Sequence, residues 1–242
     1  MSPQHTFRAY DEELKFLANR IAAMGGHAER MVDEAVAALI NSDPVLAGKV
    51  VDADAVLDAG QREIDDKAIL VIARRQPMAA DLREIIGAIR ISADLERVGD
   101  LGKNIAKRVL AVTDGRQPPS LFRGLQALAD LALTQLKEVL DVYATRDVDR
   151  ISFVRDRDEQ IDAMYTSLFR ELLSYMMEDP RNITACTHLL FCAKNIERIG
   201  DHATNIAETV YYIVTGQQMP PERPKEDESH KVTVTPEQTR AR

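Results

Sequence analysis

A duplicated segment of fourteen residues constrains the fold of this chain more than any other feature of its sequence. Residues 94–107 and 195–208 align without a gap and share Glu, Arg, Gly, Asp, Asn, Ile and Ala at the same places. Val98 and Ile199 add a conservative apolar match. Chance rarely gives identity at about half of the positions over such a stretch, so we infer an internal duplication.

The shared Glu and Asp of this segment are four residues apart in both copies. On an α-helix that spacing puts both carboxylates on one face, about one turn apart. Like charges so placed destabilise a helix by roughly 0.2–0.5 kcal/mol. The pair therefore requires a cation, which is either an Arg or Lys from elsewhere in the chain or a metal ion.

Helical periodicity extends over most of the chain. Apolar residues recur at helical spacing, and Pro, Gly and Asp-Pro pairs separate the stretches. The pattern predicts six long helices, over about residues 11–41, 43–75, 77–113, 121–145, 147–178 and 181–214. No segment alternates convincingly at period two. The predicted fold is all-α, with two tandem antiparallel three-helix bundles related by the duplication.

The duplication and the breaks between helices also give the domain boundaries. We assign residues 7–116 to the first three-helix bundle and residues 120–216 to the second. Residues 217–242 are rich in Pro, Thr and charge and have no helical stripe, which predicts a flexible tail.

Each motif is preceded by an Asp pair with the same four-residue spacing. Residues at one level of an antiparallel helical hairpin have sequence numbers with a constant sum, and both hairpins centre on the prolines at their tips. This register pairs every upstream Asp with one motif carboxylate: Asp58 with Glu96, Asp54 with Asp100, Asp162 with Glu197, and Asp158 with Asp201. We therefore predict a cluster of four carboxylates near the middle of each bundle.

Two interpretations of these clusters are open. The carboxylates could belong to salt-bridge networks with Arg62, Arg97, Arg155 or Arg198, which is the usual role of a single pair. Four pairs in matched, duplicated register favour a metal site, and oxygen ligands suit hard or borderline cations without choosing among Mg, Mn, Fe and Zn. No Glu-x-x-His accompanies them, so a ferritin-like di-iron site is not expected.

Three further positions lie near the motifs. Gly99 and Gly200 stand inside helices directly before the Asp, which predicts close approach of a neighbouring helix. His202 follows the second Asp and is either a ligand or, as we favour, a histidine at the surface or the edge of the core.

The tip of the first hairpin carries Arg74, Arg75 and Arg83. Arg near a helix C-terminus suits the helix dipole, so these residues have a structural explanation. The second tip, over residues 178–181, lacks the Arg pair. The difference makes the first tip a candidate surface for a partner or an anion.

Composition limits the remaining classes of function. The formal net charge of −8 argues against a sequence-independent hold on nucleic acid. No run approaches about 18 apolar residues, and no secretory signal opens the chain. Cys186 and Cys192 do not form a CxxC motif and are expected to be reduced thiols of the core. These features fit a cytoplasmic protein.

At these residues the chain resembles the PhoU family of phosphate-transport regulators. The duplicated ERVGD/ERIGD motif, the upstream Asp pairs and RRQPMAADLR over residues 74–83 carry the resemblance, which covers about residues 7–216. It implies multinuclear metal clusters, of iron or zinc first and of Mn or Mg second. The candidate ligands carried over are Asp54, Asp58, Glu96, Asp100, Asp158, Asp162, Glu197 and Asp201.

The resemblance also implies a function. The family is not enzymatic and represses the phosphate-starvation response and phosphate uptake. It implies a metal-binding adaptor between the ATPase of the phosphate ABC transporter and the phosphate-sensor histidine kinase, reaching the membrane only through these partners. We further expect a homodimer that does not bind nucleic acid.

Two other functions compete with the regulatory one. Metals a few ångströms apart can drive phosphoryl chemistry, so the clusters could belong to a metal-dependent phosphohydrolase. Alternatively, the chain is a structural dimer whose carboxylates form plain salt bridges and bind no metal.

Overall fold

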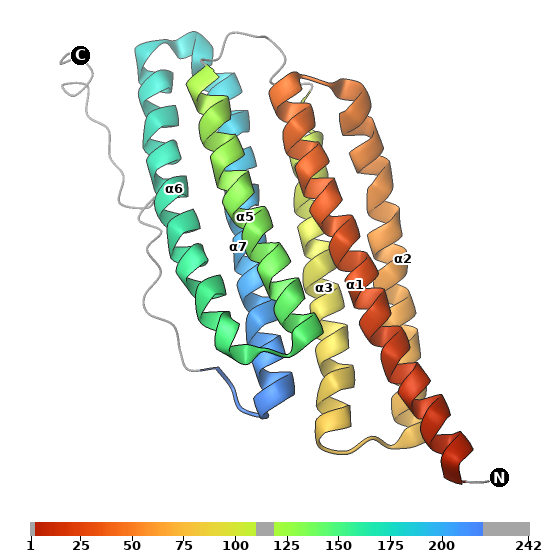
Figure 1. Cartoon of the computed structure of the whole chain (residues 1–242). Helices are drawn as coiled ribbons and strands as arrows, with labels where there is room; N and C mark the ends of the chain where they lie inside the picture. Colours follow the sequence, from red (N-terminus) through yellow and green to blue (C-terminus); the bar gives the residue numbers. More distant parts are fainter. Residues whose placement is uncertain (1–2, 110–118, 220–242) are drawn as a thin grey trace.

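The computed structural model describes residues 3–109 and 119–219, and within these ranges the chain forms six long helices, two short 3₁₀ helices and no strand (Figure 1). The long helices are α1 (Pro3–Asn41), α2 (Pro44–Arg75), α3 (Ala80–Ala106), α5 (Pro119–Thr145), α6 (Ile151–Glu178) and α7 (Ile183–Thr215). The short ones, η1 (Val148–Arg150) and η2 (Pro180–Asn182), lead into α6 and α7. The all-α prediction is confirmed.

The helices form two antiparallel three-helix bundles that lie side by side. Helices α1, α2 and α3 pack on one another, as do α5, α6 and α7 (Figure 1). Between the bundles, α3 runs along α7 and α1 runs along α5. The predicted arrangement of two tandem bundles is therefore confirmed. No helix within the described ranges is long and apolar enough to cross a membrane.

Local chemistry explains where α2 begins and ends. Asp43 caps it, because its Oδ1 accepts the backbone N–H of Val45 at 2.9 Å and of Leu46 at 3.0 Å. Pro44 suits the first helical position. After Arg75 the chain leaves the helix through Gln76, whose φ of 49° is left-handed. These bounds agree with the predicted ones.

Other predicted bounds need correction. Helix α1 begins at Pro3 instead of Asp11, since no helix breaker lies between them and Tyr10 packs against the core. Helix α3 begins at Ala80 instead of Pro77, because Ala79 turns the chain with a φ of 48°. It ends at Ala106, and the end predicted near residue 113 lies outside the described residues, as does the tail from residue 220.

Close approach of helices holds the two bundles together. A Cβ added to Gly25 of α1 would lie 2.7 Å from Leu140 Cδ1 of α5. One added to Gly87 of α3 would lie 2.3 Å from Ile213 Cδ1 of α7. Because glycine has no side chain, the facing helices can approach closely at these two positions. Leu140 and Ile213 occupy the space that a side chain there would need.

The two thiols are buried in α7. Cys186 and Cys192 are 1% and 0% exposed, and neither is in a disulfide. Burial raises the pKa of Cys192 to about 12, against a lowering by the nearby Arg108 guanidinium. The prediction of reduced core thiols is confirmed.

Candidate functional site

The first carboxylate cluster lies between α2 and α3 and contains a lysine. Lys103 Nζ donates to Asp100 Oδ1 at 2.6 Å and also donates to Asp54 Oδ2 on the facing helix. One ammonium therefore bridges the two carboxylates, which places Asp54 level with Asp100 as the register predicts. Burial alone would lower the pKa of Lys103, but its hydrogen bonds to Asp100 and Asp54 raise that pKa above the ordinary value.

Glu96 and Asp58 complete this cluster. Burial raises the pKa of Glu96, and repulsion from Asp100, Asp58 and Asp54 adds to the rise. Arg97 opposes it, with Nε 3.5 Å from Glu96 Oε2. The charges of Asp54, Asp58 and Asp100 therefore act on Glu96, whereas the role of the four residues as one metal-binding cluster stays a prediction.

The second cluster lies between α6 and α7 and is more deeply buried at one end. Asp162 and Glu197 are 4% and 3% exposed. Lys194 Nζ lies 2.8 Å from Glu197 Oε1 and 4.9 Å from the centre of the Tyr165 ring. This lysine thus neutralises the Glu of the second cluster, whereas Lys103 neutralises the Asp residues of the first.

Asp158 lies at the other end of the second cluster, opposite α7. Its Oδ1 accepts a hydrogen bond of 3.3 Å from Gln135 Nε2 of α5. The same Oδ1 would lie 3.4 Å from a Cβ added to Gly200, the residue before Asp201. This places Asp158 close to the Asp201 level, in agreement with the predicted register.

The predicted close approach at both motif glycines is confirmed. A Cβ on Gly99 would lie 2.2 Å from Leu57 Cδ1, and one on Gly200 would lie 3.0 Å from Gln135 Oε1 and 3.1 Å from Ile161 Cδ1. The glycines bring α3 against α2 and α7 against α6, so the carboxylates of facing helices can meet.

His202 lies at the edge of the core between the bundles. Its Nδ1 is 2.9 Å from Asp94 Oδ1 of α3, and both side chains are less than one-fifth exposed. The core-edge interpretation of His202 is confirmed. Asn205 Nδ2 also donates to Asp94 at 3.4 Å.

The three Arg of the first hairpin tip do not share one surface role. Arg75 Nε lies 2.9 Å from Glu13 Oε2 of α1. Arg83 Nε donates to the carbonyl oxygen of Ile213 at 3.4 Å, at the end of α7. Arg74 is exposed. Two of the three therefore stabilise helix packing, and the partner or anion surface stays a prediction that rests on Arg74.

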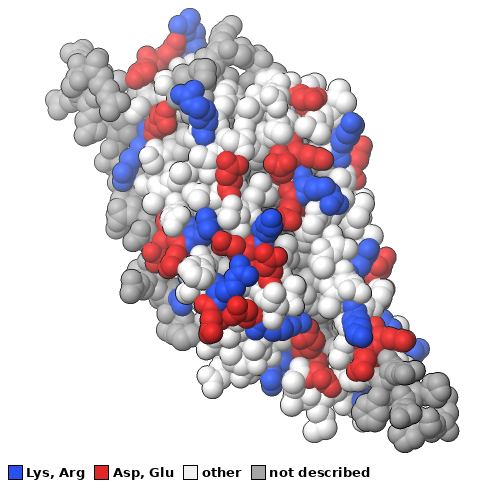
Figure 2. All heavy atoms as spheres, in the orientation of Figure 1, with Lys and Arg blue, Asp and Glu red and all other residues white. Residues whose placement is uncertain are grey.

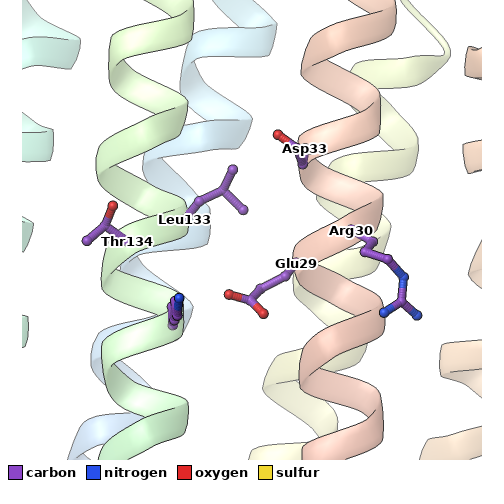
Figure 3. Close-up of a pocket in the computed structure, with 6 residues that line it drawn as sticks. Glu29, Arg30, Asp33, Leu133 and Thr134 are labelled. Atoms are coloured by element: carbon purple, nitrogen blue, oxygen red, sulfur yellow. The ribbon is translucent and has the colours of Figure 1, made fainter.

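The structure also has a pocket that the sequence did not indicate. It has a volume of about 440 Å³ and lies between α1 and α5 (Figure 3). Its lining residues, Glu29, Arg30, Asp33, Leu133, Thr134 and Lys137, pair up at a constant offset of 104 residues, which is the offset of the two Asp pairs. The pocket is thus centred between equivalent parts of the duplication.

Charge around this pocket is mixed. Figure 3 shows that the Glu29 carboxylate points toward α5, whereas the Arg30 side chain points away from α5. Burial raises the pKa of Glu29, against a lowering by Lys137. Acidic and basic side chains are interspersed over the face that Figure 2 shows, without a broad basic area there.

The side chains present can be compared with what a metal ion needs. The donors are carboxylate oxygens, which suit a hard cation, and buried Asp54 Oδ1 has no hydrogen-bond partner within the described residues. Lys103 already places a positive charge between Asp54 and Asp100. The chemistry of the clusters therefore fits a cation. No group of three or more His, Cys, Asp or Glu in the described ranges is close enough to hold a metal, so ligands would have to turn inward.

Sequence reasoning missed both lysines of the clusters. Lys103 lies three residues after Asp100, inside the duplicated segment, where the other copy has Thr204. Lys194 lies three residues before Glu197, where the first copy has Ala93. Helical spacing of three residues could have identified both, because it puts each ammonium beside its carboxylate.

Comparison with known proteins gives matches over most of the chain. The family model described as "PhoU domain" matches twice, at residues 21–109 and 125–210. A phosphate-specific transport system accessory protein PhoU homolog of Rhizobium meliloti (strain 1021) is 67% identical over 94% of this chain and 96% of the relative. Its counterpart in Caulobacter vibrioides (strain NA1000 / CB15N) is 50% identical over 93% and 97%.

Solved structures share the fold. The crystal structure of PhoU from Pseudomonas aeruginosa matches with a TM-score of 0.82 and 37% identity, covering 86% of this chain and 100% of that one. The crystal structure of the phosphate transport system regulatory protein PhoU from Streptococcus pneumoniae matches with a TM-score of 0.81 and 27% identity, covering 88% and 100%.

Proposed function

The chain belongs to the PhoU family, and we propose that it is a regulatory accessory protein of a phosphate transport system that represses the phosphate-starvation response when phosphate is plentiful. One observation carries this proposal: the similarity to relatives named accessory proteins of phosphate-specific transport extends over nearly the whole of both chains. The similarity therefore covers whole proteins and is not limited to a single domain.

We also propose partners for this role. We place the protein in the cytoplasm as an adaptor between the ATPase of the phosphate ABC transporter and the phosphate-sensor histidine kinase, and as a homodimer. Support comes from the accessory role in the names of the relatives and from the long helices, whose outer faces offer extended surfaces.

The carboxylate clusters are proposed to hold metal ions, with iron or zinc first. The ligands would be Asp54, Asp58, Glu96 and Asp100 in the first cluster and Asp158, Asp162, Glu197 and Asp201 in the second. A bound cation would neutralise these carboxylates and join α2 to α3 and α6 to α7. The support is the donor chemistry and the orphaned Asp54 Oδ1.

Disruption of the gene in its host tests the regulatory proposal. Without the protein, a phosphate-starvation reporter and phosphate uptake should be high even in phosphate-rich medium, and the wild-type chain should restore repression. A reporter that stays repressed without the protein would contradict the proposal. Co-purification from cross-linked cells should recover the transporter ATPase and the sensor kinase, and would identify the partners separately.

We further propose that the protein acts by binding and not by turnover, since its relatives are named accessory or regulatory proteins. The competing phosphohydrolase function predicts release of phosphate from phosphate esters by the metal-loaded protein. Metal-dependent turnover that is lost in Asp100→Ala would overturn the purely regulatory proposal. Turnover that persists when Asp100→Ala is combined with Asp201→Ala would indicate a contaminating phosphatase.

A further inference from the structure

The connection between α2 and α3 lies at one end of the molecule, opposite the connection between α6 and α7 (Figure 1). Every exposed residue from position 69 to position 82, a stretch that the structure describes throughout, is apolar except Arg74 and Gln76. Met78 is 81% exposed. We define the tip patch as the large exposed apolar side chains of this stretch and its one exposed charge: Ile69, Leu70, Arg74, Met78 and Leu82.

The patch follows the chain without a break. Leu70 and Arg74 are four residues apart near the end of α2, so they share one face of that helix. Met78 lies in the connection, and Leu82 lies in the first turn of α3. Apolar side chains that are scattered singly over a surface need no explanation, whereas exposed apolar side chains gathered in one place mark an interaction site.

The backbone of the connection is strained and held in place. Gln76 and Ala79 have left-handed φ values of 49° and 48°, which residues with a Cβ rarely adopt. Arg75 Nε lies 2.9 Å from Glu13 Oε2, an ion pair that holds the end of α2 against α1. Strained backbone persists only where its surroundings hold it, and it occurs preferentially at functional sites. The connection is therefore a preorganised surface.

The equivalent connection of the second bundle is different. Its exposed residues include charged Glu178 and Arg181 next to the apolar Ile183. Arg181 Nη2 lies 2.6 Å from Asp179 Oδ2, so its charge is paired within the same connection. Arg74, in contrast, forms no ion pair within the described residues. The free guanidinium and the apolar surroundings are thus a feature of the first bundle alone.

Charge decides which kind of partner fits the tip patch. A second copy of this chain would bring Arg74 close to another Arg74, and the exposed residues of the stretch include no carboxylate to pair with either. An anionic membrane is held by clusters of about 4–8 basic residues, and this stretch exposes one. A partner protein needs only one carboxylate beside an apolar groove, and Met and Arg are enriched at protein interfaces.

We infer that the tip patch docks into an apolar groove of a partner protein, with Met78 inserted in the groove and Arg74 paired with a carboxylate at its rim. The inference rests on the proposed adaptor role, and it assigns the docking to the first bundle. The partner is then one of the two proteins that this role joins, the transporter or the sensor kinase.

Binding of the full-length chain to two probes tests the inference, the detergent-solubilised phosphate transporter and the detergent-solubilised sensor kinase of the same host. Met78→Ser should keep the fold, because the side chain is exposed, and circular dichroism checks this. It should weaken binding to one of the two probes by about 10–30-fold. Ile183→Ser in the second connection, where Ile183 is 47% exposed, is the matched control and should bind as the wild type does.

Exchange of the charge tests the second half of the contact. Arg74→Glu should weaken binding to the same probe by about tenfold, because it places two carboxylates against each other. Arg74→Lys keeps the charge and should retain most of the affinity. In cells, Met78→Ser should fail to restore repression of the phosphate-starvation reporter, whereas Ile183→Ser should restore it.

The outcomes separate this inference from the proposed function. Wild-type affinity of Met78→Ser for both probes would overturn the inference and leave the adaptor role standing. A wild-type chain that binds neither probe would overturn the proposed partners, and the docking with them. Binding of the wild type to phosphatidylglycerol vesicles, or its self-association in sedimentation, would overturn the partner protein if Met78→Ser abolished it. A membrane or a second copy would then cover the tip patch.

Discussion

Asp94 of α3 and His202 of α7 meet across the interface of the two bundles, with Oδ1 and Nδ1 2.9 Å apart. The equivalent positions of the duplication are occupied by Asn195 and Leu101, which cannot form the same charged contact across the interface. Both side chains are less than one-fifth exposed, so solvent screens the interaction between them only weakly. The contact is therefore expected to stabilise the docking of the bundles.

A double-mutant cycle measures that contribution. Asp94→Asn and His202→Leu introduce the residues of the other half, and both singles should lower the free energy of unfolding. Their interaction energy should be about 1 kcal/mol, because directly contacting polar residues couple at this scale. Additive effects of the two substitutions in urea denaturation would show that the contact does not stabilise the interface.

Lys103 and Arg97 both contact Asp100 but should differ in their effects. Lys103 is 20% exposed and bridges two carboxylates, whereas Arg97 is 63% exposed and contacts Asp100 at 3.2 Å. Exposed ion pairs contribute little, while removing one partner of a shielded pair leaves a charge uncompensated. In metal-free buffer, Lys103→Met should destabilise the protein by about 2 kcal/mol. Arg97→Met should cost less than about 0.5 kcal/mol, and equal losses would contradict this account.

Much of the site could be predicted from residue spacing. The duplication, the prolines at the hairpin tips and the four-residue pairs were enough to place Asp54 level with Asp100 and to expect tight packing at Gly99. These features depend on backbone geometry, which periodicity encodes directly. The helix bounds near Pro3 and Ala79 were less predictable, because they depend on tertiary packing and on one left-handed residue.

The contacts between bundles could not be predicted in the same way. Asp94 contacts His202, and Gly87 lies against Ile213, each across a pair of helices from different bundles. The periodicity of the sequence does not determine how such helices are placed relative to each other. The contacts of the buried Gln135 amide were equally hidden, since its Nε2 donates to one backbone carbonyl and two side chains on other helices. Spacing thus indicated which residues share a helix face, and the structure was needed to show what each face contacts.

Gly87 should be intolerant of even a small side chain. A Cβ there would lie 2.3 Å from Ile213 Cδ1 and 2.6 Å from Cγ1, so Gly87→Ala must displace the buried Ile213 side chain or push α3 away from α7. Overpacking of this kind costs about 1–3 kcal/mol. Gly48 of α2 is the matched control, since nothing lies within 4 Å of its added Cβ. Gly48→Ala should stabilise the protein by about 0.5–1 kcal/mol through helix propensity, and a stabilising Gly87→Ala would show that the interface yields.

Tyr143 should make the protein sensitive to alkaline pH. It is 4% exposed, and burial raises its pKa from 10.0 to about 12, with Glu84 adding to the rise and Arg146 opposing it. Between these pH values the unfolded chain releases the phenolic proton while the folded chain retains it, so stability falls as pH rises. Tyr143→Phe removes this contribution and should reduce the loss of stability between pH 10 and pH 12 by about 2 kcal/mol. Urea titrations at neutral and alkaline pH measure the difference, and an unchanged alkaline loss in Tyr143→Phe would assign the sensitivity to other groups.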